Sequence, residues 1–215
     1  MRVLIGAAAA NRLLAKLDDA FAALAEAEAP ARAAAADRAL AEIHYLRGNL
    51  HFARGELDSC RNEHSAALEA ALRLDSREWR AHALSGLADA QYLDCRMATA
   101  LELFSECVEL NEAAGFTRVL TANRVMMGVC RYYLCAFDAA LDEVRRGLDI
   151  ARRIGNQHGE MMALLVTGMT MTMAGRYKEA TDILPQALEQ ARALNARRFE
   201  SNILGICAEL ALVRG

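Results

Sequence analysis

Residues 45–68 read YLRGNLHFARGELDSCRNEHSAAL, and this stretch decides the fold that the sequence predicts. Its apolar residues recur at helical spacing on both sides of Gly55, which is typical of two amphipathic helices joined by a tight turn. Gly48, Cys60 and Ala67 are small, and small residues let two packed helices approach closely. The stretch therefore predicts an antiparallel helical hairpin.

The hairpin pattern recurs every 40 residues along the chain. Units counted from Ala41, Ala81, Thr121, Met161 and Ser201 all carry a small residue at their eighth place, namely Gly48, Ala88, Gly128, Gly168 and Ala208. The fifteenth place is always glycine or cysteine, where a turn is expected. A fixed period of this length indicates a repeat architecture. Each unit is predicted to hold helix A at places 1–14 and helix B at about places 17–34.

The register predicts one repeat domain over residues 1–215. Its units are 1–40, which is a weaker copy, then 41–80, 81–120, 121–160, 161–200 and a half unit, 201–215. The half unit has a helix A without a helix B, and repeat arrays usually end in a polar cap. We therefore expect that the chain is a fragment of a longer protein, or that a second copy or a partner covers Leu204, Cys207 and Leu210.

This pattern resembles the tetratricopeptide repeat (TPR) family, whose signature is a helical hairpin with small residues at the helix crossing points. The stretch VTGMTMTMAGRYKEATDILPQAL (166–188) carries the signature as clearly as 45–68. HEAT repeats share a period of about 40 residues, but the small-residue columns favour TPR. The resemblance implies an all-α, right-handed superhelical solenoid of antiparallel helix pairs, with about 11 helices. The long units are similar to the TPR arrays of large bacterial regulators with ATPase, adenylate-cyclase or LuxR-type domains.

Composition narrows the classes of partner. The chain has 25 basic and 28 acidic residues, a net charge of −3 and no long run of one sign, so we expect no nucleic-acid partner. No apolar stretch reaches the roughly 20 residues of a membrane-spanning helix. The six cysteines form no CxxC pair, which favours a reducing compartment. We therefore predict a cytoplasmic protein without membrane contact.

The sequence contains no phosphate-binding loop, dinucleotide fingerprint, zinc-protease motif or nucleophile elbow, so we expect a protein that is not an enzyme and needs no cofactor. One cluster contains His and Cys side chains, which are residue types that can bind a metal ion. It comprises His44, His51, Cys60 and His64, which all face the interior of one hairpin in the predicted register. Zinc is one interpretation. Packing of imidazole and thiol groups is favoured instead, because the spacing matches no metal motif.

The resemblance implies a ligand groove on the concave surface, with contacts from places 2, 5, 9, 12 and 13 of each helix A. In this chain the candidate groove residues are Tyr45, Asn49, Phe52, His82, Asp89, Tyr92, Val125, Val129, Tyr132, Tyr133, Met162, Leu165, Met169 and Met173. The N-terminal half of this groove is mixed and aromatic, and the C-terminal half is apolar. Methionine is flexible, so the apolar half could adapt to an amphipathic helix.

We therefore hypothesise a regulatory or signalling module that binds a helix or peptide, or part of its own chain, in the concave groove. One alternative is a small-molecule sensor whose ligand contacts Tyr45, His82, Asp89 and Tyr92. A third hypothesis is a self-assembly unit, such as a homodimer joined through the half unit 201–215.

Overall fold

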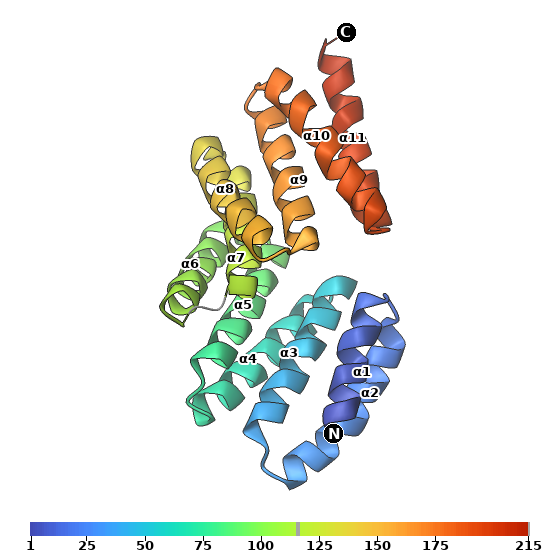
Figure 1. Ribbon diagram of the computed structural model, residues 1–215. Helices are drawn as coiled ribbons and strands as arrows, with labels where there is room; N and C mark the ends of the chain where they lie inside the picture. Colours follow the sequence, from blue (N-terminus) through green and yellow to red (C-terminus); the bar gives the residue numbers. More distant parts are fainter. Residues whose placement is uncertain (115–116, 215) are drawn as a thin grey trace. The chain divides into compact units, whose positions relative to one another are not determined.

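The computed structural model describes residues 1–114 and 117–214 (Figure 1). Within these ranges all regular secondary structure is α-helical, which confirms the predicted all-α class. The chain divides into two compact units, unit 1 (Met1–Gly115) and unit 2 (Phe116–Gly215), and each is described by itself. A single solenoid over the whole chain stays a prediction.

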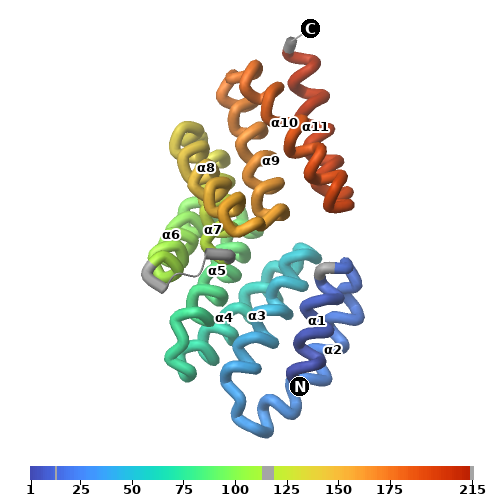
Figure 2. Tube along the Cα trace, viewed as in Figure 1, coloured from blue at the N-terminus to red at the C-terminus, as the bar shows by residue number. Residues whose placement is uncertain are grey.

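Unit 1 consists of three helical hairpins. Its helices are α1 (Arg2–Leu13), α2 (Leu17–Ala33), α3 (Asp37–Arg54), α4 (Leu57–Arg73), α5 (Arg77–Leu93) and α6 (Met97–Ala114). Unit 2 continues with α7 (Thr117–Tyr133), α8 (Phe137–Arg153), α9 (Gln157–Met173), α10 (Tyr177–Ala193) and α11 (Arg197–Arg214). The tube in Figure 2 shows how short turns connect successive helices within each unit. Odd-numbered helices correspond to helix A of the predicted repeat and even-numbered helices to helix B.

The turns between helices share one backbone conformation. A residue with positive φ follows the helix in each described turn, and these residues are Ala15, Ala35, Gly55, Asp75, Cys95, Cys135, Gly155, Gly175 and Asn195. They recur in steps of 20 residues on both sides of position 115, which lies outside the described residues, so the 40-residue period contains two equivalent turns. A left-handed residue directly after a helix lets its last carbonyl groups accept hydrogen bonds from the turn. This confirms the turns predicted at the fifteenth places held by Gly55, Cys95, Cys135 and Gly175, whereas Gly215 lies outside the described residues.

In every unit after the first, helix A begins four residues earlier than predicted. The A helices start at Asp37, Arg77, Thr117 and Gln157 rather than at the first place of each unit. The reason is the turn that ends helix B, which needs only about three residues before the next helix begins. Helix A therefore gains a full turn at its N-terminal end.

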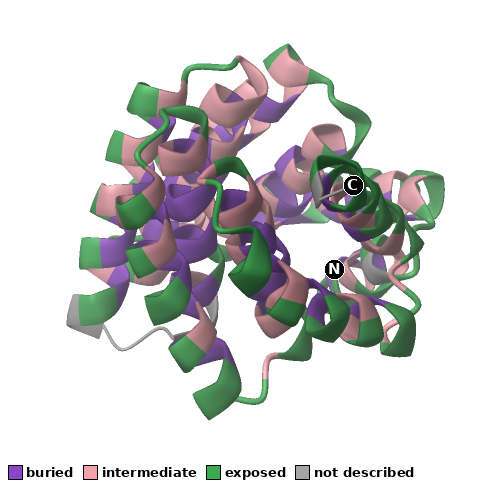
Figure 3. Cartoon of the chain, turned by 90° about the horizontal axis from the view of Figure 1, so that it is seen from above, coloured by how far each residue is buried: buried purple, intermediate pink, exposed green. Residues whose placement is uncertain are grey.

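The A helices form a continuous layer within each unit. In unit 1, α3 contacts both α1 and α5, and in unit 2, α9 contacts both α7 and α11. Among the described residues, the B helices of a unit do not contact one another. The A-helix layer is therefore the tighter, inner layer, and the B helices fan out behind it. Figure 3 shows that buried residues gather where helices face one another.

The small-residue columns lie where helix A crosses helix B. A Cβ atom added to Gly168 of α9 would lie 2.5 Å from Leu184 Cδ2 of α10, a distance too short for two carbon atoms. Leu184 itself is 1% exposed. The eighth place must therefore stay small because the residue on helix B occupies the space. This confirms the close helix crossing predicted from the columns.

Helix α11 packs against α10 and partly against α9. Leu210, which the sequence predicted to be uncovered, is only 4% exposed because it joins the hydrophobic core of unit 2. Leu204 is 44% exposed and Cys207 is half-buried. Coverage of this helix by a partner stays a prediction. None of the described helices combines the length and apolarity needed to span a bilayer.

Candidate functional site on the faces of the A helices

An aromatic cluster joins α3 to α5 on the A-helix layer of unit 1. The ring centroid of Tyr45 lies 4.8 Å from that of His82, and the Trp79 centroid lies 5.1 Å from His82. Tyr45 and Trp79 meet edge to face at 6.2 Å. These separations are those of stabilising aromatic pairs. Two of the predicted groove residues, Tyr45 and His82, are thus brought together from adjacent hairpins.

Asn49 and Asp89 extend the same surface. Asn49 hydrogen-bonds Tyr45 one turn earlier on α3. Asp89 is half-buried on α5, and burial raises the pKa of its carboxyl to about 7. Burial is also the largest cause that raises the pKa of Tyr45; the Asp89 charge adds to it, whereas the Asn49 hydrogen bond and Arg12 oppose it. The surface therefore places a carboxylate and a phenol in surroundings that disfavour negative charge.

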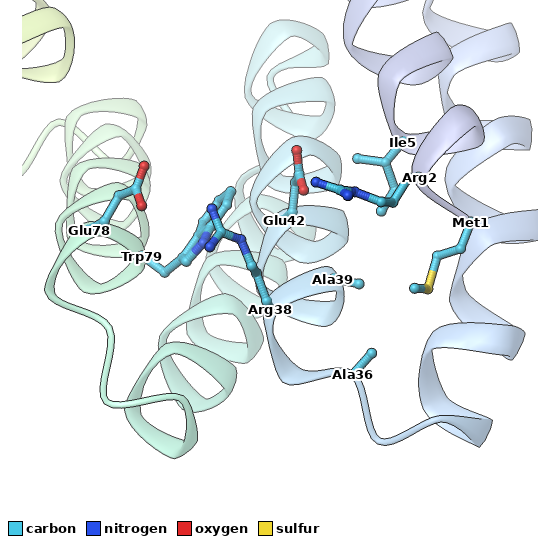
Figure 4. A pocket seen from close by; sticks show the side chains of 9 residues that line it. All are labelled: Met1, Arg2, Ile5, Ala36, Arg38, Ala39, Glu42, Glu78 and Trp79. Atoms are coloured by element: carbon cyan, nitrogen blue, oxygen red, sulfur yellow. The ribbon is translucent and has the colours of Figure 1, made fainter.

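A pocket of about 750 Å³ opens at the N-terminal ends of α1, α3 and α5 (Figure 4). It is lined by Met1, Arg2, Ile5, Ala36, Arg38, Ala39, Glu42, Glu78 and Trp79. In Figure 4 the Arg2 side chain extends from α1 toward Glu42 of α3. Burial raises the pKa of Glu42, and the charges of Arg38 and Arg2 oppose that rise. The pocket thus combines an apolar floor with charged side chains of both signs.

Sequence reasoning missed Arg38, Glu78 and Trp79 as site residues. All three lie in the extra first turn of helix A, before the predicted helix start. The signal that could have found them is the 20-residue spacing of turn residues, which fixes where each A helix begins. Phe52 and Tyr92 are half-buried near the other ends of α3 and α5, where the sequence predicted them.

His64 lies directly beneath the aromatic cluster. It is fully buried between Gly48 of α3 and Gly86 of α5, and a Cβ atom on either glycine would lie within 2.5 Å of the imidazole. Neither ring nitrogen has a hydrogen-bond partner. Burial lowers the pKa of His64 to about 4, so the ring is neutral at physiological pH. His64 fills a helix crossing that Val144 and Leu184 fill in unit 2.

The structure does not support the zinc alternative. His44 Nδ1 is 2.7 Å from Glu63 Oε2, and His51 Nδ1 is 2.5 Å from Glu56 Oε2, so both imidazoles are engaged by carboxylates. Burial is the main cause that raises the pKa of Cys60 to about 12, so the thiol is protonated in the free protein. The described residues hold no group of three or more His, Cys, Asp or Glu side chains arranged for a metal ion.

The A-helix face of unit 2 is less open than the sequence suggested. Val125, Val129 and Leu165 are at most 7% exposed, so they belong to the packed interior and not to an open groove. Val125 is buried because it packs against Gly147 of α8. Tyr132, Met162 and Met169 are half-buried, whereas Tyr133 and Met173 are exposed.

Tyr132 contributes a half-buried phenol group to the A-helix face of unit 2. Its ring lies 5.1 Å from that of Tyr133 in an edge-to-face arrangement. Burial is the main cause that raises the pKa of Tyr132, and the charges of Tyr133 and Glu209 on α11 add to it. Because Glu209 acts on Tyr132, α7 and α11 both contribute to the surroundings of this side chain.

No family model and no curated protein sequence matches this chain. Several solved structures are similar to it. A Rap protein in complex with competence and sporulation factor superposes with a TM-score of 0.78 at 13% identity, covering 94% of this chain and 60% of the Rap protein. A signal transduction ATPase with numerous domains and a tetratricopeptide repeat sensor, from Pyrococcus horikoshii, superposes at 0.71 and 11% identity, covering 94% of this chain and 31% of its own.

A third structure consists of the TPR-like repeats of a kinesin light chain from Podosopora anserina. It superposes with a TM-score of 0.64 at 14% identity and covers 92% of this chain and 95% of its own. The chain has the TPR fold. At these identities the likeness establishes the fold, and the faces of this TPR chain carry its individual chemistry.

Proposed function

We propose that this TPR protein is a non-enzymatic interaction module that binds a peptide or a helical segment on its A-helix faces. One observation supports the proposal above the others. The A helices of unit 1 adjoin and present the half-buried rings of Tyr45 and His82 beside Trp79, which itself lines a pocket of about 750 Å³. Half-buried side chains still have solvent-accessible surface, and a bound partner could cover that surface.

The similar structures support a protein or peptide ligand. The Rap structure contains competence and sporulation factor, and the ATPase is described as carrying its TPR array as a sensor. In both superpositions, 94% of the present chain is matched to the other structure. A regulatory role, in which ligand binding changes the output of a larger assembly, is therefore the proposed context.

The A-helix face of unit 2 is a second, more apolar part of the proposal and is considered by itself. Met162 and Met169 of α9 are half-buried, and Met173 is 58% exposed. Methionine adapts its shape at low energetic cost, which suits an amphipathic helix or an apolar peptide side chain. Tyr132 adds a hydroxyl group that can bond a ligand backbone.

The experiment is a selection of displayed 12-residue peptides on the purified protein, followed by binding measurements on the best synthetic peptide. One variant replaces the unit 2 face, Tyr132→Lys with Met162→Lys and Met169→Lys. A second replaces the unit 1 face, Phe52→Lys with Tyr92→Lys. The matched controls place the same numbers of lysines on exposed B-helix positions: Asn62→Lys with Ala98→Lys in unit 1, and Tyr177→Lys with Gln186→Lys and Ala193→Lys in unit 2.

We expect at least one A-face variant to weaken binding of the selected peptide at least tenfold, whereas the B-helix controls stay within about twofold. Circular dichroism verifies that each variant is folded. Equal binding by folded A-face variants and wild type would refute the proposed surface. Failure of the wild-type protein to select any peptide would refute the peptide-binding function.

The pocket also favours a second candidate function, a small-molecule sensor. A volume of about 750 Å³ lies within the range of small-ligand sites, and charged groups of both signs line it. A thermal-shift screen with metabolites tests this function, because a ligand that binds only the folded state raises the unfolding midpoint. A zwitterionic metabolite that stabilises the wild type, but not Glu42→Gln, would favour the sensor over the peptide module.

A further inference from the structure

Asp89 is a carboxylate without a partner on the A-helix layer of unit 1. No hydrogen bond or ion pair joins it to any described residue, although it is half-buried. Unit 1 has several polar side-chain atoms that are fully buried and have no hydrogen-bond partner, including atoms of His64 and His82. The Asp89 oxygens are not among them, so they keep some contact with solvent. Asp89 is therefore enclosed by protein but open to a ligand.

The neighbours of Asp89 do not neutralise it. Its charge acts on the Tyr45 phenol and on the Cys60 thiol, and both groups are neutral at physiological pH. Burial is the only cause acting on the carboxyl itself among the described residues, so no described arginine, lysine or histidine offsets its charge. The side chain of Asn49 is already engaged by Tyr45.

The other carboxylates of this surface differ. Glu42 has the charges of Arg38 and Arg2 acting on it. Glu63 and Glu28, behind the A-helix layer, bind Arg47 at 3.2 and 2.7 Å. An enclosed carboxylate is normally paired with a cation, because desolvation without compensation is unfavourable. Asp89 departs from the pattern that the same unit follows elsewhere.

A ligand cation would supply the missing partner. A guanidinium or ammonium group can donate several hydrogen bonds to a carboxylate and cancel its charge. The aromatic rings of Tyr45 and His82 lie on the same surface, and tyrosine faces attract arginine and lysine. One turn along α5 from Asp89, Tyr92 is half-buried and adds a third ring.

We propose that Asp89 binds an arginine or lysine side chain of the peptide ligand and so makes this TPR surface selective for a basic residue. The proposal rests on the proposed function, because it names the chemistry that the unit 1 face recognises. Asn49, Tyr45 and Tyr92 surround the cation and position the ligand residue that carries it. Asp89 thus acts as a specificity-determining residue.

The test compares peptide selections on the wild type, Asp89→Asn and the matched control Asp19→Asn. Asp19 is an exposed carboxylate on B helix α2 of the same unit and has no ion pair among the described residues, so its loss changes the net charge identically. We expect wild type and Asp19→Asn to enrich peptides with arginine or lysine at one fixed position. Asp89→Asn should lose that enrichment and remain folded.

A double-mutant cycle then assigns the contact. The basic residue of the selected peptide is replaced with glutamine, and binding is measured on wild type and on Asp89→Asn. We expect the peptide change to weaken wild-type binding at least 30-fold and to weaken Asp89→Asn binding less than threefold, since coupled residues are non-additive. Equal losses on both proteins would overturn the contact.

The remaining outcomes separate this inference from the proposed function. Selected peptides without a common basic residue would overturn the role of Asp89 and leave the peptide-binding module standing. No selected peptide at all would remove both. Agmatine alone, binding wild type as tightly as the basic peptide does, would show that a free amine and not a peptide side chain is the ligand, and would overturn the peptide assignment.

Discussion

Unit 1 and unit 2 use the same hairpins but fill them with different chemistry. Both place left-handed turn residues in 20-residue steps and both form an inner layer of A helices. At the crossing where helix A meets helix B, unit 2 has aliphatic Val144 and Leu184, whereas unit 1 has His64. The inner surface of unit 1 carries titratable and aromatic groups, and that of unit 2 carries methionines and Tyr132.

A second pair of equivalent positions shows the same freedom. His44 contacts Glu63 at 2.7 Å in unit 1, and Arg124 donates to Glu143 at 2.6 Å in unit 2, at the fourth and twenty-third places of their repeats. The difference teaches that the TPR scaffold needs particular residue sizes at the crossings and particular conformations at the turns. It tolerates buried polar groups at other places, as His44 and Arg124 show.

The largest effect should come from moving the unit 1 histidine into unit 2. Leu184→His removes aliphatic packing and buries an imidazole without a partner, so we expect a loss of about 4 kcal/mol in the free energy of unfolding. Urea unfolding followed by far-UV circular dichroism measures it. Leu184→Ala, which only creates a cavity, should lose about 3 kcal/mol. A Leu184→His protein as stable as wild type would show that this crossing is not tightly packed.

The next effect concerns the buried pair of unit 2. Arg124→Ala leaves Glu143 buried, with Arg131 and Arg146 at 3.9 Å as more distant partners. We expect a loss of about 2 to 3 kcal/mol, below the full value for an orphaned buried charge because these arginines compensate in part. The double variant Arg124→Met with Glu143→Leu should recover most of the stability. A double variant less stable than Arg124→Ala would contradict this assignment.

Replacing the unit 1 histidine should have a smaller effect of opposite sign. His64→Leu removes two unpartnered ring nitrogens, and we expect a gain of about 1 to 2 kcal/mol. The pKa of His64 is lowered from 6.5 to about 4, so protonation of the unfolded chain makes wild type lose stability as pH falls from 6.5 to about 4. His64→Leu should lack that part of the pH dependence. Trp79 is the single tryptophan and reports on unit 1. The unfolding of His64→Leu and of wild type is followed by Trp79 fluorescence between pH 6.5 and 4. If both proteins lose the same stability over this range, His64 is not the source of the acid sensitivity.

The smallest stability effect belongs to Asp89. Its pKa is raised from 3.8 to about 7, so its protonated form stabilises unit 1 below about pH 4 and that stabilisation is lost as pH rises to about 7. Asp89→Asn should therefore stabilise unit 1 at pH 8 by about 1 kcal/mol, a value discounted for the remaining solvent contact. Asp19→Asn, an exposed control, should change little. Destabilisation by Asp89→Asn at pH 8 would show that the carboxylate has a partner in the free protein.

The fold was largely predictable because its determinants repeat. A small residue at the eighth place and a turn residue at the fifteenth are read directly from five copies of the pattern, and Gly168 shows the steric reason. The start of helix A was not predictable to the residue from these columns. It depends on how few residues the preceding turn needs, and Ala35 adopts positive φ without being a typical turn residue.

The site was predictable only in part. His82 and Asp89 are seven residues apart and share a face of α5, and the Tyr45 ring of α3 lies 4.8 Å from that of His82. Val125 and Leu165 were expected on the open face but are buried, since neighbouring helices cover wide apolar stripes that spacing alone does not reveal. The absence of a cation near Asp89 among the described residues also depends on packing between hairpins, which sequence columns do not encode.

Photocrosslinking with the selected peptide tests most directly whether the A-helix faces are the interaction surface. Benzoylphenylalanine replaces Phe52 on A helix α3 in one protein and exposed Asn62 on B helix α4 in another, and mass spectrometry locates the adducts. We expect the peptide to crosslink at position 52 and not at position 62. Efficient crosslinking at position 62 with none at position 52 would contradict the proposed binding face.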